Sequence, residues 1–343
     1  MKIKTRYFSA LTVLVVSATI GHAAEVDMGA VRQAQEAFVE RMVAEHGFER
    51  GELTRILDDA EIDAQILEAI SRPAERVLPW HEYRGIFVND SRVDGGVEFW
   101  KTHADEIENA SEDYGVPPEL LVAILGVETY YGRRMGSHRV IDALATLAFA
   151  YPPRSAFFAS ELEAFFLLAR EEGIDPEEAL GSYAGAMGAG QFISSSYRAY
   201  AVDGNDDGQR DLWADWQDVL ASVANYFSAH GWRREEPVVN RASRSANWSG
   251  SEPPNSINLD ETVASLNAAG YVFSTDLPDE TPATVLSLEG EGAQEYWVGY
   301  HNFYVITRYN RSVMYALASH QLGQTILQEY ERTRFDAAPG GGQ

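Results

Sequence analysis

The feature that most constrains the fold is a long block of helical patterning over residues 97–231. Apolar residues recur there at spacings of three and four positions, most clearly over 157–170 and 219–230, and this period is typical of helices with one buried face. Within the block, Val116-Pro117-Pro118-Glu119 predicts a helix start, because proline suits the first helical turn. We expect that helix to end near Gly132.

Outside this block the patterning is shorter and mixed. Residues 26–72 are predicted to be helical, whereas 78–93 show mixed polarity and are expected to be irregular. Further along, turn-forming residues dominate, with short β-like runs at 283–288 and 303–307 before a final helix over about 313–332. The predicted class is therefore mainly α (α+β), with a small β-containing region.

Residues 1–23 are predicted to be a secretory signal peptide. A basic start (MKIKTR) precedes an apolar run over 8–21, which is too short for a membrane-spanning helix. Gly21-His22-Ala23 then supplies the small residues typical of a cleavage site, after Ala23 or Ala24. We therefore expect the rest of the chain to be exported.

The amino-acid composition limits the classes of partner that the protein can bind. The 343 residues include 27 Lys and Arg against 52 Asp and Glu, a formal net charge of −25, and no cysteine. This acidity argues against nucleic acid, since phosphate binding needs clustered basic residues, and against docking on anionic lipid. The lack of cysteine excludes disulfides, thiolate metal sites and a cysteine-linked lipid anchor. We expect a soluble, monomeric periplasmic protein without a membrane anchor.

Glu128 stands out as a candidate catalytic acid. It shares a helical face with Leu121 and Leu125, and this apolar face should desolvate its carboxyl group. Desolvation raises a carboxyl pKa, and the negative end of the helix dipole acts in the same direction. A carboxyl that keeps its proton near neutral pH suits a general acid. The alternative is a buried glutamate paired with Arg133 or Arg134.

Residues 182–192 (SYAGAMGAGQF) are rich in glycine and alanine, which allow a ligand to approach the backbone closely. The segment contains no basic residue, which argues against a phosphate-binding loop. Gln191 has donor and acceptor groups that suit an acetamido group or a hydroxyl. The alternative is tight packing between helices.

A run of acidic residues and glycines at 203–211 resembles the start of an EF-hand loop. The residues at ligand positions 1, 3, 5 and 7 are Asp203, Asn205, Asp207 and Gln209. Position 12, normally a bidentate glutamate, is Ala214, so the last carboxylate must come from Asp215 or from Asp218. We predict an enlarged loop that Asp218 closes at the start of the next helix. A Ca²⁺ ion held here would be structural. The alternative is a solvated acidic turn.

Together these motifs resemble those of the membrane-bound lytic murein transglycosylase B type, whose core is similar to goose-type lysozyme. The matching segments are 126–132 (GVETYYG), 142–148 (DALATLA), 151–154 (YPPR), 182–191 (SYAGAMGAGQ), 195–197 (SSY), 200–203 (YAVD), 222–227 (SVANYF) and 302–310 (NFYVITRYN), followed by Tyr315. The resemblance extends over residues 27–332.

The resemblance implies a peptidoglycan lytic transglycosylase with Glu128 as its single catalytic acid and base. It implies contacts to the glycan or its peptide from Ser182, Gln191, Arg154, Asn302, Tyr309, Asn310 and Tyr315. It also implies a core calcium loop that is longer than the ordinary EF-hand loop. Three departures stand out: the lipidated cysteine of membrane-bound members is missing, Pro153 replaces one arginine of a pair, and Phe157 replaces a tyrosine.

Two-carboxylate glycosidases need a second acid across the bond, and the nearest candidates, Asp142, Glu161 and Glu163, lie on ordinary helix faces. We therefore expect Glu128 to protonate the oxygen between N-acetylmuramic acid and N-acetylglucosamine, with help from the substrate's 2-acetamido group at C1. Glu128 would then accept the proton of the muramic O6 as this oxygen closes a 1,6-anhydro ring. The alternatives are a muramidase, a non-catalytic calcium-stabilised glycan-binding protein, and a calcium-regulated interaction protein.

The predicted organisation has six parts. They are a signal peptide at 1–23, an N-terminal helical region at 24–96, a lysozyme-like catalytic core with the EF-hand-like loop at 97–235, a small β-containing region at 236–310, a closing helix at 311–335 and a disordered tail at 336–343.

Overall fold

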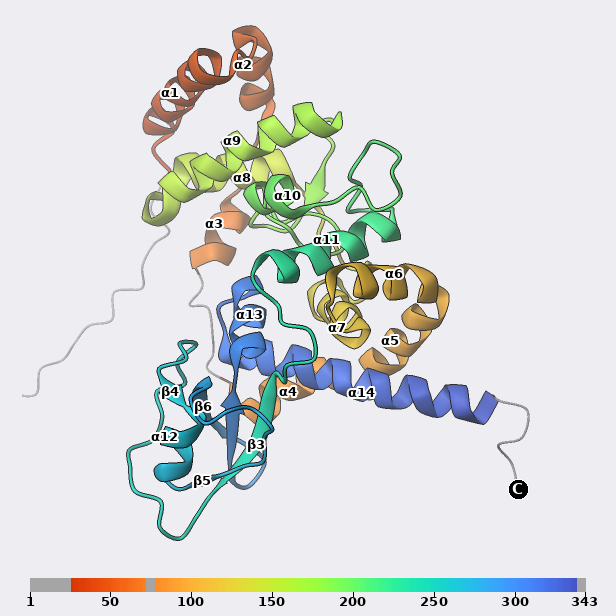
Figure 1. Ribbon diagram of the computed structural model, residues 1–343. Coiled ribbons are helices and arrows are strands. Elements are labelled where there is room, and N and C mark those ends of the chain that lie inside the picture. Colours follow the sequence, from red (N-terminus) through yellow and green to blue (C-terminus); the bar gives the residue numbers. More distant parts are fainter. Residues whose placement is uncertain (1–25, 72–77, 338–343) are drawn as a thin grey trace, which may run out of the picture.

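The computed structural model describes residues 26–71 and 78–337 (Figure 1). Its first helices are α1 (Met28–His46), α2 (Arg50–Asp59) and α3 (Ala64–Ser71). The Asp27 side chain begins α1 by accepting hydrogen bonds from the next backbone N–H groups, and Gly47 ends it in the left-handed conformation at φ 66°. These helices agree with the helical structure predicted for residues 26–72. Both α1 and α3 pack on α8 (Val140–Ala150).

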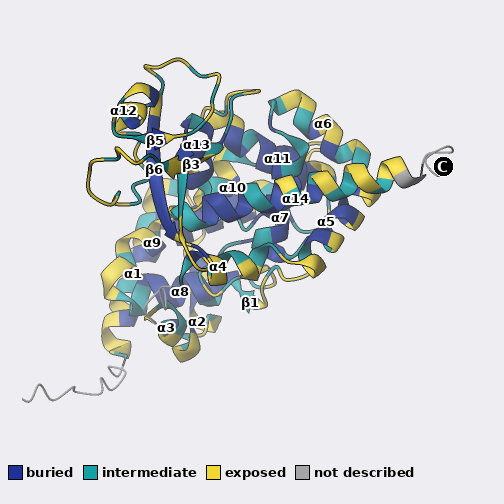
Figure 2. Ribbon diagram, turned by 90° about the horizontal axis from the view of Figure 1, so that it is seen from below, coloured by how far each residue is buried: buried dark blue, intermediate teal, exposed yellow. Residues whose placement is uncertain are grey.

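The central helices contain most of the core. They are α5 (Asp90–Thr102), α6 (Ala104–Tyr114), α7 (Pro118–Thr129), α8, the 3₁₀ turn η1 (Pro152–Arg154), α9 (Ser155–Glu172), α10 (Ser194–Tyr200) and α11 (Trp216–Ala229). A two-stranded ribbon of β1 (His138–Arg139) and β2 (Leu180–Gly181) lies among them. Residues 120–126 of α7 are all buried. Figure 2 shows this buried centre and the exposed outer turns around it.

A small sheet follows α11. Its strands are β3 (Val239–Arg244), β4 (Glu261–Thr262), β5 (Tyr271–Val272), β6 (Pro282–Glu289) and β7 (Gln294–Gly299), paired antiparallel in the order β4-β6-β7-β3-β5. With α12 (Val263–Ala268) it encloses a second core that includes Tyr271, Val298 and Tyr300. In Figure 1 this sheet lies at the bottom, far from α1 and α2.

Two helices close the fold, α13 (His301–Tyr309) and α14 (Val313–Ala337). α14 runs across α7, α5 and α4 (Trp80–Phe87). Gly323 allows the close approach to α7, because a Cβ there would lie 2.8 Å from the Glu119 carbonyl oxygen. This crossing brings Tyr315, at the start of α14, to the end of α7.

Two local predictions were wrong. Residues 303–307 are helical within α13, where Phe303 and Ile306 point into the core; burial on a helical face overrides the β-propensity of these residues. The segment 78–93 is also helical, as α4 and the first turn of α5. Trp80 is fully buried there, and the Asn89 side chain caps α5 by accepting a hydrogen bond from the Arg92 N–H.

The predicted fold class, mainly α with a small antiparallel sheet, is confirmed. The predicted signal peptide lies outside the described residues, as do residues 338–343 of the predicted tail, whereas α14 continues to Ala337. Across residues 26–71 and 78–337, none of the helices combines the length and apolar character that a membrane span requires.

Candidate active site

Glu128 lies in the last turn of α7, whose end has an unusual backbone. Tyr130 and Tyr131 both adopt left-handed conformations, at φ 55° and 60°, and the N–H of Tyr131 donates to the Leu125 carbonyl at 3.0 Å. The Tyr131 ring then folds back on Gly126, where a Cβ would lie 2.7 Å from the Tyr131 hydroxyl oxygen. Gly126 is therefore required for the turn that fixes the position of Glu128.

The Glu128 carboxyl group faces two tyrosines from the C-terminal helices. The Tyr315 hydroxyl donates to Glu128 Oε1 at 2.5 Å, and the Tyr309 hydroxyl donates to the Gly190 carbonyl at 2.5 Å. Burial and the charge of Glu128 raise the pKa of both phenols well above the usual range. Both tyrosines therefore keep their protons near neutral pH and can act as hydrogen-bond donors.

Burial raises the pKa of Glu128 from 4.5 to about 7. The hydrogen bond from Tyr315 opposes this rise, because it stabilises the charged carboxylate. The outcome agrees with the desolvation expected from the apolar face of α7. A pKa near neutrality allows one carboxyl group to give and to regain a proton in a single turnover.

The alternative interpretation of Glu128, a buried glutamate in an ion pair with a nearby arginine, is not observed. Within the described residues, neither Arg133 nor Arg134 forms an ion pair with it, and both are exposed. The three other acids considered are occupied elsewhere. Asp142 pairs with Arg139, Glu161 accepts hydrogen bonds from Ser195, and Glu163 pairs with Arg41 and His46.

The glycine-rich segment forms a compact turn beside Glu128. Thr129, the neighbour of Glu128, donates to the Ala189 carbonyl at 2.8 Å, and Gly188 is so close to the Leu212 carbonyl oxygen that a Cβ would lie 2.4 Å from it. Gln191 takes φ 53° and its amide donates to the Met135 and Gly188 carbonyls, both at 3.1 Å. The segment therefore packs as a loop against α7, and the side-chain amide oxygen of Gln191 has no assigned protein donor among the described residues.

Ser182 begins the same segment. Its hydroxyl oxygen accepts the N–H of Ala186 at 3.0 Å and that of Ala184 at 3.4 Å. The hydroxyl proton is left free to donate, so Ser182 can both shape the turn and hold a polar group.

Thr129 was not predicted as a site residue, although its hydroxyl lies next to the acid in the GVET motif and was an indication of such a role.

The remaining predicted contacts are more scattered. Arg154 is exposed, with its guanidinium carbon 4.4 Å from the Phe157 ring centre, and Asn310 is exposed at the end of α13. Asn302 is different, because it is fully buried and its amide binds the backbone of Arg233 at 2.9 and 2.8 Å and of Glu236 at 2.8 Å. The structure thus gives Asn302 a structural role and does not place it at a glycan surface.

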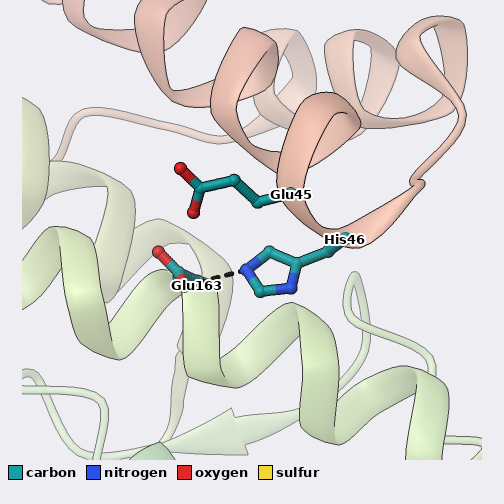
Figure 3. Close-up of side chains that lie close together, drawn as sticks. All are labelled: Glu45, His46 and Glu163. Atoms are coloured by element: carbon teal, nitrogen blue, oxygen red, sulfur yellow. Dashed lines mark hydrogen bonds and ion pairs between the residues drawn. The ribbon is translucent and has the colours of Figure 1, made fainter.

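A cluster of metal-ligand type lies away from this site. Glu45 and His46 at the end of α1 face Glu163 of α9 (Figure 3). The His46 ring nitrogen and Arg41 occupy the two carboxylate oxygens of Glu163, each at 2.9 Å. These contacts join α1 to α9 and engage both carboxylate oxygens of Glu163 within the fold.

The predicted calcium loop has a suitable set of donors. The side chains of Asp203, Asn205 and Asp207 turn inward to accept backbone N–H groups of the loop. Asp218, at the start of α11, is buried and accepts the N–H groups of Gly204 and Asp211, each at 2.7 Å.

The electrostatics of the loop favour a cation. Burial, together with the charges of Asp215 and Asp203, raises the pKa of Asp218, although its two backbone hydrogen bonds act against the rise. Hard oxygen donors with uncompensated negative charge fit Ca²⁺. Within the described parts of the chain, the loop carboxylates do not form a set of three within 4.8 Å, so an ion would need the Asn205 and Gln209 oxygens too.

Comparison with known proteins identifies the family of this chain. A model of the transglycosylase SLT domain matches residues 30–324. The chain is 43% identical over 302 residues to membrane-bound lytic murein transglycosylase B of Escherichia coli (strain K12), a match that covers 85% of this chain and 82% of that protein.

Two solved structures are close in fold. Catenated lytic transglycosylase SltB1 of Pseudomonas aeruginosa matches with a TM-score of 0.84 at 47% identity, over 86% of this chain and 97% of that chain. The Escherichia coli lytic transglycosylase Slt35, in complex with calcium, matches with a TM-score of 0.79 at 41% identity, over 87% and 94%.

These relatives are all named lytic transglycosylases, which supports that activity over the muramidase and binding-protein alternatives. The family match spans the N-terminal helices, the central helices, the small sheet, α13 and about the first half of α14. The chain therefore belongs to the transglycosylase SLT family and is a lytic transglycosylase of peptidoglycan.

Proposed function

We propose that Glu128 alone carries both proton transfers in the cleavage of the bond between N-acetylmuramic acid and N-acetylglucosamine. The observation that carries this proposal is the Glu128–Tyr315 pair, in which a desolvated carboxyl with a pKa of about 7 is held by a phenol. The other acids considered, Asp142, Glu161 and Glu163, have structural partners.

The proposed reaction has two steps. Protonated Glu128 gives its proton to the glycosidic oxygen, and the bond to C1 breaks as the substrate's own 2-acetamido oxygen bonds to C1. The Glu128 carboxylate then takes the proton from the muramic O6. This oxygen attacks C1, displaces the acetamido oxygen and closes the 1,6-anhydro ring, so Glu128 ends protonated and no water is consumed.

The two tyrosines and the glycine-rich loop would position Glu128 and the sugar for the reaction. The Tyr315 donor steadies the carboxylate formed after the first transfer, and Tyr309 anchors Gly190 beside it. We assign Gln191, Ser182, Asn310 and Arg154 to sugar or peptide contacts, because each keeps unused hydrogen-bonding capacity or exposure. Asn302 is left out of this set, because its amide is fully engaged within the fold.

We further propose that the loop at 203–218 binds Ca²⁺ through Asp203, Asn205, Asp207, the Gln209 carbonyl and Asp218. The oxygen-only donors and the buried Asp218 support this, as does the calcium complex of the Escherichia coli relative. The ion would tie the loop to the start of α11 and take no part in bond making.

We also propose that the protein acts in the periplasm, since its substrate is peptidoglycan and residues 1–23 have the pattern of an export signal. Cell fractionation with a C-terminal tag tests the location. Recovery from the cytoplasmic fraction would contradict it.

Muropeptide analysis by mass spectrometry tests the reaction itself. Digestion of purified sacculi should release fragments with 1,6-anhydro ends, each lighter by one water than the hydrolysis product. Glu128→Gln should release none. Reducing ends as the main product would instead show that water takes the place of O6.

A further inference from the structure

Three arginines surround one aromatic ring just beyond the catalytic acid. The guanidinium carbons of Arg92, Arg133 and Arg134 lie 4.9, 5.5 and 5.4 Å from the centre of the Tyr130 ring. Tyr130 comes two positions after Glu128, at the point where α7 ends. In a chain with a net charge of −25, such a concentration of positive charge is a local exception.

None of the three charges has a carboxylate partner. In the described part of the chain, arginines such as Arg50 and Arg139 pair with carboxylates, whereas Arg92, Arg133 and Arg134 form no ion pair. One Arg92 nitrogen donates to the Gly126 carbonyl, and its buried Nε has no partner. Burial and the nearby charge of Arg134 lower the pKa of Arg92, which is the opposite of what a paired arginine shows.

Arg92 and the Tyr130 ring are held in place by contacts with neighbouring residues. Arg92 lies between the rings of Phe87 and Tyr130, with its guanidinium carbon 5.3 and 4.9 Å from their centres. The Tyr130 hydroxyl bonds to Ser91, and the N–H of Arg134 donates to the Thr129 carbonyl at 2.9 Å. Arg92 is therefore held in a fixed position, and a positive charge that is fixed before any ligand arrives lowers the cost of binding an anion.

The segment that carries this cluster leads directly into the site. Residues 130–135 join Glu128 on α7 to Met135, whose carbonyl accepts the Gln191 amide. Arg133 and Arg134 are exposed, so their guanidinium donors are free for a ligand. Planar guanidinium groups match carboxylates in shape and charge.

From this geometry we propose that Arg92, Arg133 and Arg134 form a subsite for the carboxylates carried by the muramic acid residues of the glycan. This rests on the proposed function, because it assumes that a muramic residue lies beside Glu128. The carboxylate has two sources in peptidoglycan: the lactyl ether itself when the peptide is absent, and the stem peptide when it is present. In both cases Arg133 and Arg134 make the contacts, while Arg92 supplies fixed charge beneath the Tyr130 ring.

Binding to an uncleaved ligand tests the subsite apart from catalysis. Calorimetry on full-length protein carrying Glu128→Gln would use three oligosaccharides of equal length: muramic-containing with stem peptides, the same without peptides, and chitooligosaccharide, which has no carboxylate. The double variant Arg133→Gln/Arg134→Gln should weaken the carboxylate-bearing ligands about tenfold more than chitooligosaccharide. The preference should also shrink as salt is added.

A matched control separates the site from net charge. Arg32→Gln/Arg334→Gln removes the same charge from two exposed arginines on α1 and α14, and it should leave the ligand preference unchanged. A larger loss for the peptide-bearing ligand than for the peptide-free one would assign the contact to the stem peptide, and the reverse would assign it to the lactyl group. Equal weakening of all three ligands, or no weakening beyond the control, would overturn the subsite.

The product assay keeps this proposal distinct from the reaction mechanism. If wild-type protein released no 1,6-anhydro ends while the arginine variant still lost its carboxylate preference, the mechanism would fail and the subsite would stand. If the anhydro ends appeared and the preference did not change, only the subsite would fail.

Discussion

The hydroxyl of Tyr315 lies 2.5 Å from Oε1 of Glu128, across the contact between the last helix of the chain and the helix that carries the acid. These residues are 187 positions apart in the sequence. The bond holds the carboxyl in one orientation and favours its charged form, while burial favours the neutral form. The pKa of about 7 is the balance between these two effects.

Glu128→Gln should remove turnover almost completely, because an amide can neither give nor take the proton. General acid–base catalysis contributes about 10²–10⁴-fold, so we expect a loss of at least about 10³-fold when one group performs both transfers. Release of soluble muropeptides measures the effect. Glu119→Gln on the same helix is the matched control, and it should keep most of the wild-type activity.

The same substitution should stabilise the protein at alkaline pH. The folded pKa of Glu128 is raised from 4.5 to about 7, so the native state binds a proton more tightly than the unfolded chain does. Ionisation therefore costs stability as pH rises from about 4.5 to 7. In thermal melts, Glu128→Gln should gain up to about 3 kcal/mol at alkaline pH and little at acid pH. A gain independent of pH would contradict the raised pKa.

Tyr315→Phe should move the pH profile. Without the phenol, the charged carboxylate loses a donor, and hydrogen bonds to charged groups contribute about 1.5–3 kcal/mol. The pKa of Glu128 should rise by about one unit, and the alkaline fall in activity should move to higher pH with it. Activity against pH measures the shift, and Tyr330→Phe on the same helix should show none.

Calcium should raise the melting temperature. A ligand that binds only the folded state at 100 times its Kd adds about 2.7 kcal/mol, and a chelator should reverse the gain. Asp203→Asn should abolish the response, because it removes a charged ligand. Asp206→Asn is the control within the same loop, since Asp206 is not a proposed ligand and asparagine tolerates its φ of 60°. An unchanged calcium response in Asp203→Asn would contradict the assignment.

Asn302→Ala should destabilise the fold and leave KM unchanged. It would strand buried polar groups of Arg233 and Glu236, at a cost of about 3 kcal/mol. Denaturant unfolding measures the loss of stability, and muropeptide kinetics measure KM. A raised KM with normal stability would instead restore Asn302 to the glycan site.

Much of the candidate site was visible in the sequence because its indications are local. Glu128 follows an apolar helical face, and the 182–192 segment shows its glycines in one run. The acidic loop at 203–209 likewise carries its own spacing. The failures were also local: 303–307 has β-branched residues but lies in a helix, because the core buries one of its helical faces.

By itself, the sequence determined the helical class, the acid on α7 and the donor set of the acidic loop, because period and spacing are properties of neighbouring residues. Only the tertiary structure decided that Tyr315 meets Glu128, that Asn302 is a buried brace, and that three arginines gather on Tyr130. These depend on the packing of α14 on α7 and α5 and on the left-handed turn at Tyr130. Contacts between distant segments exist only once the core has brought them together.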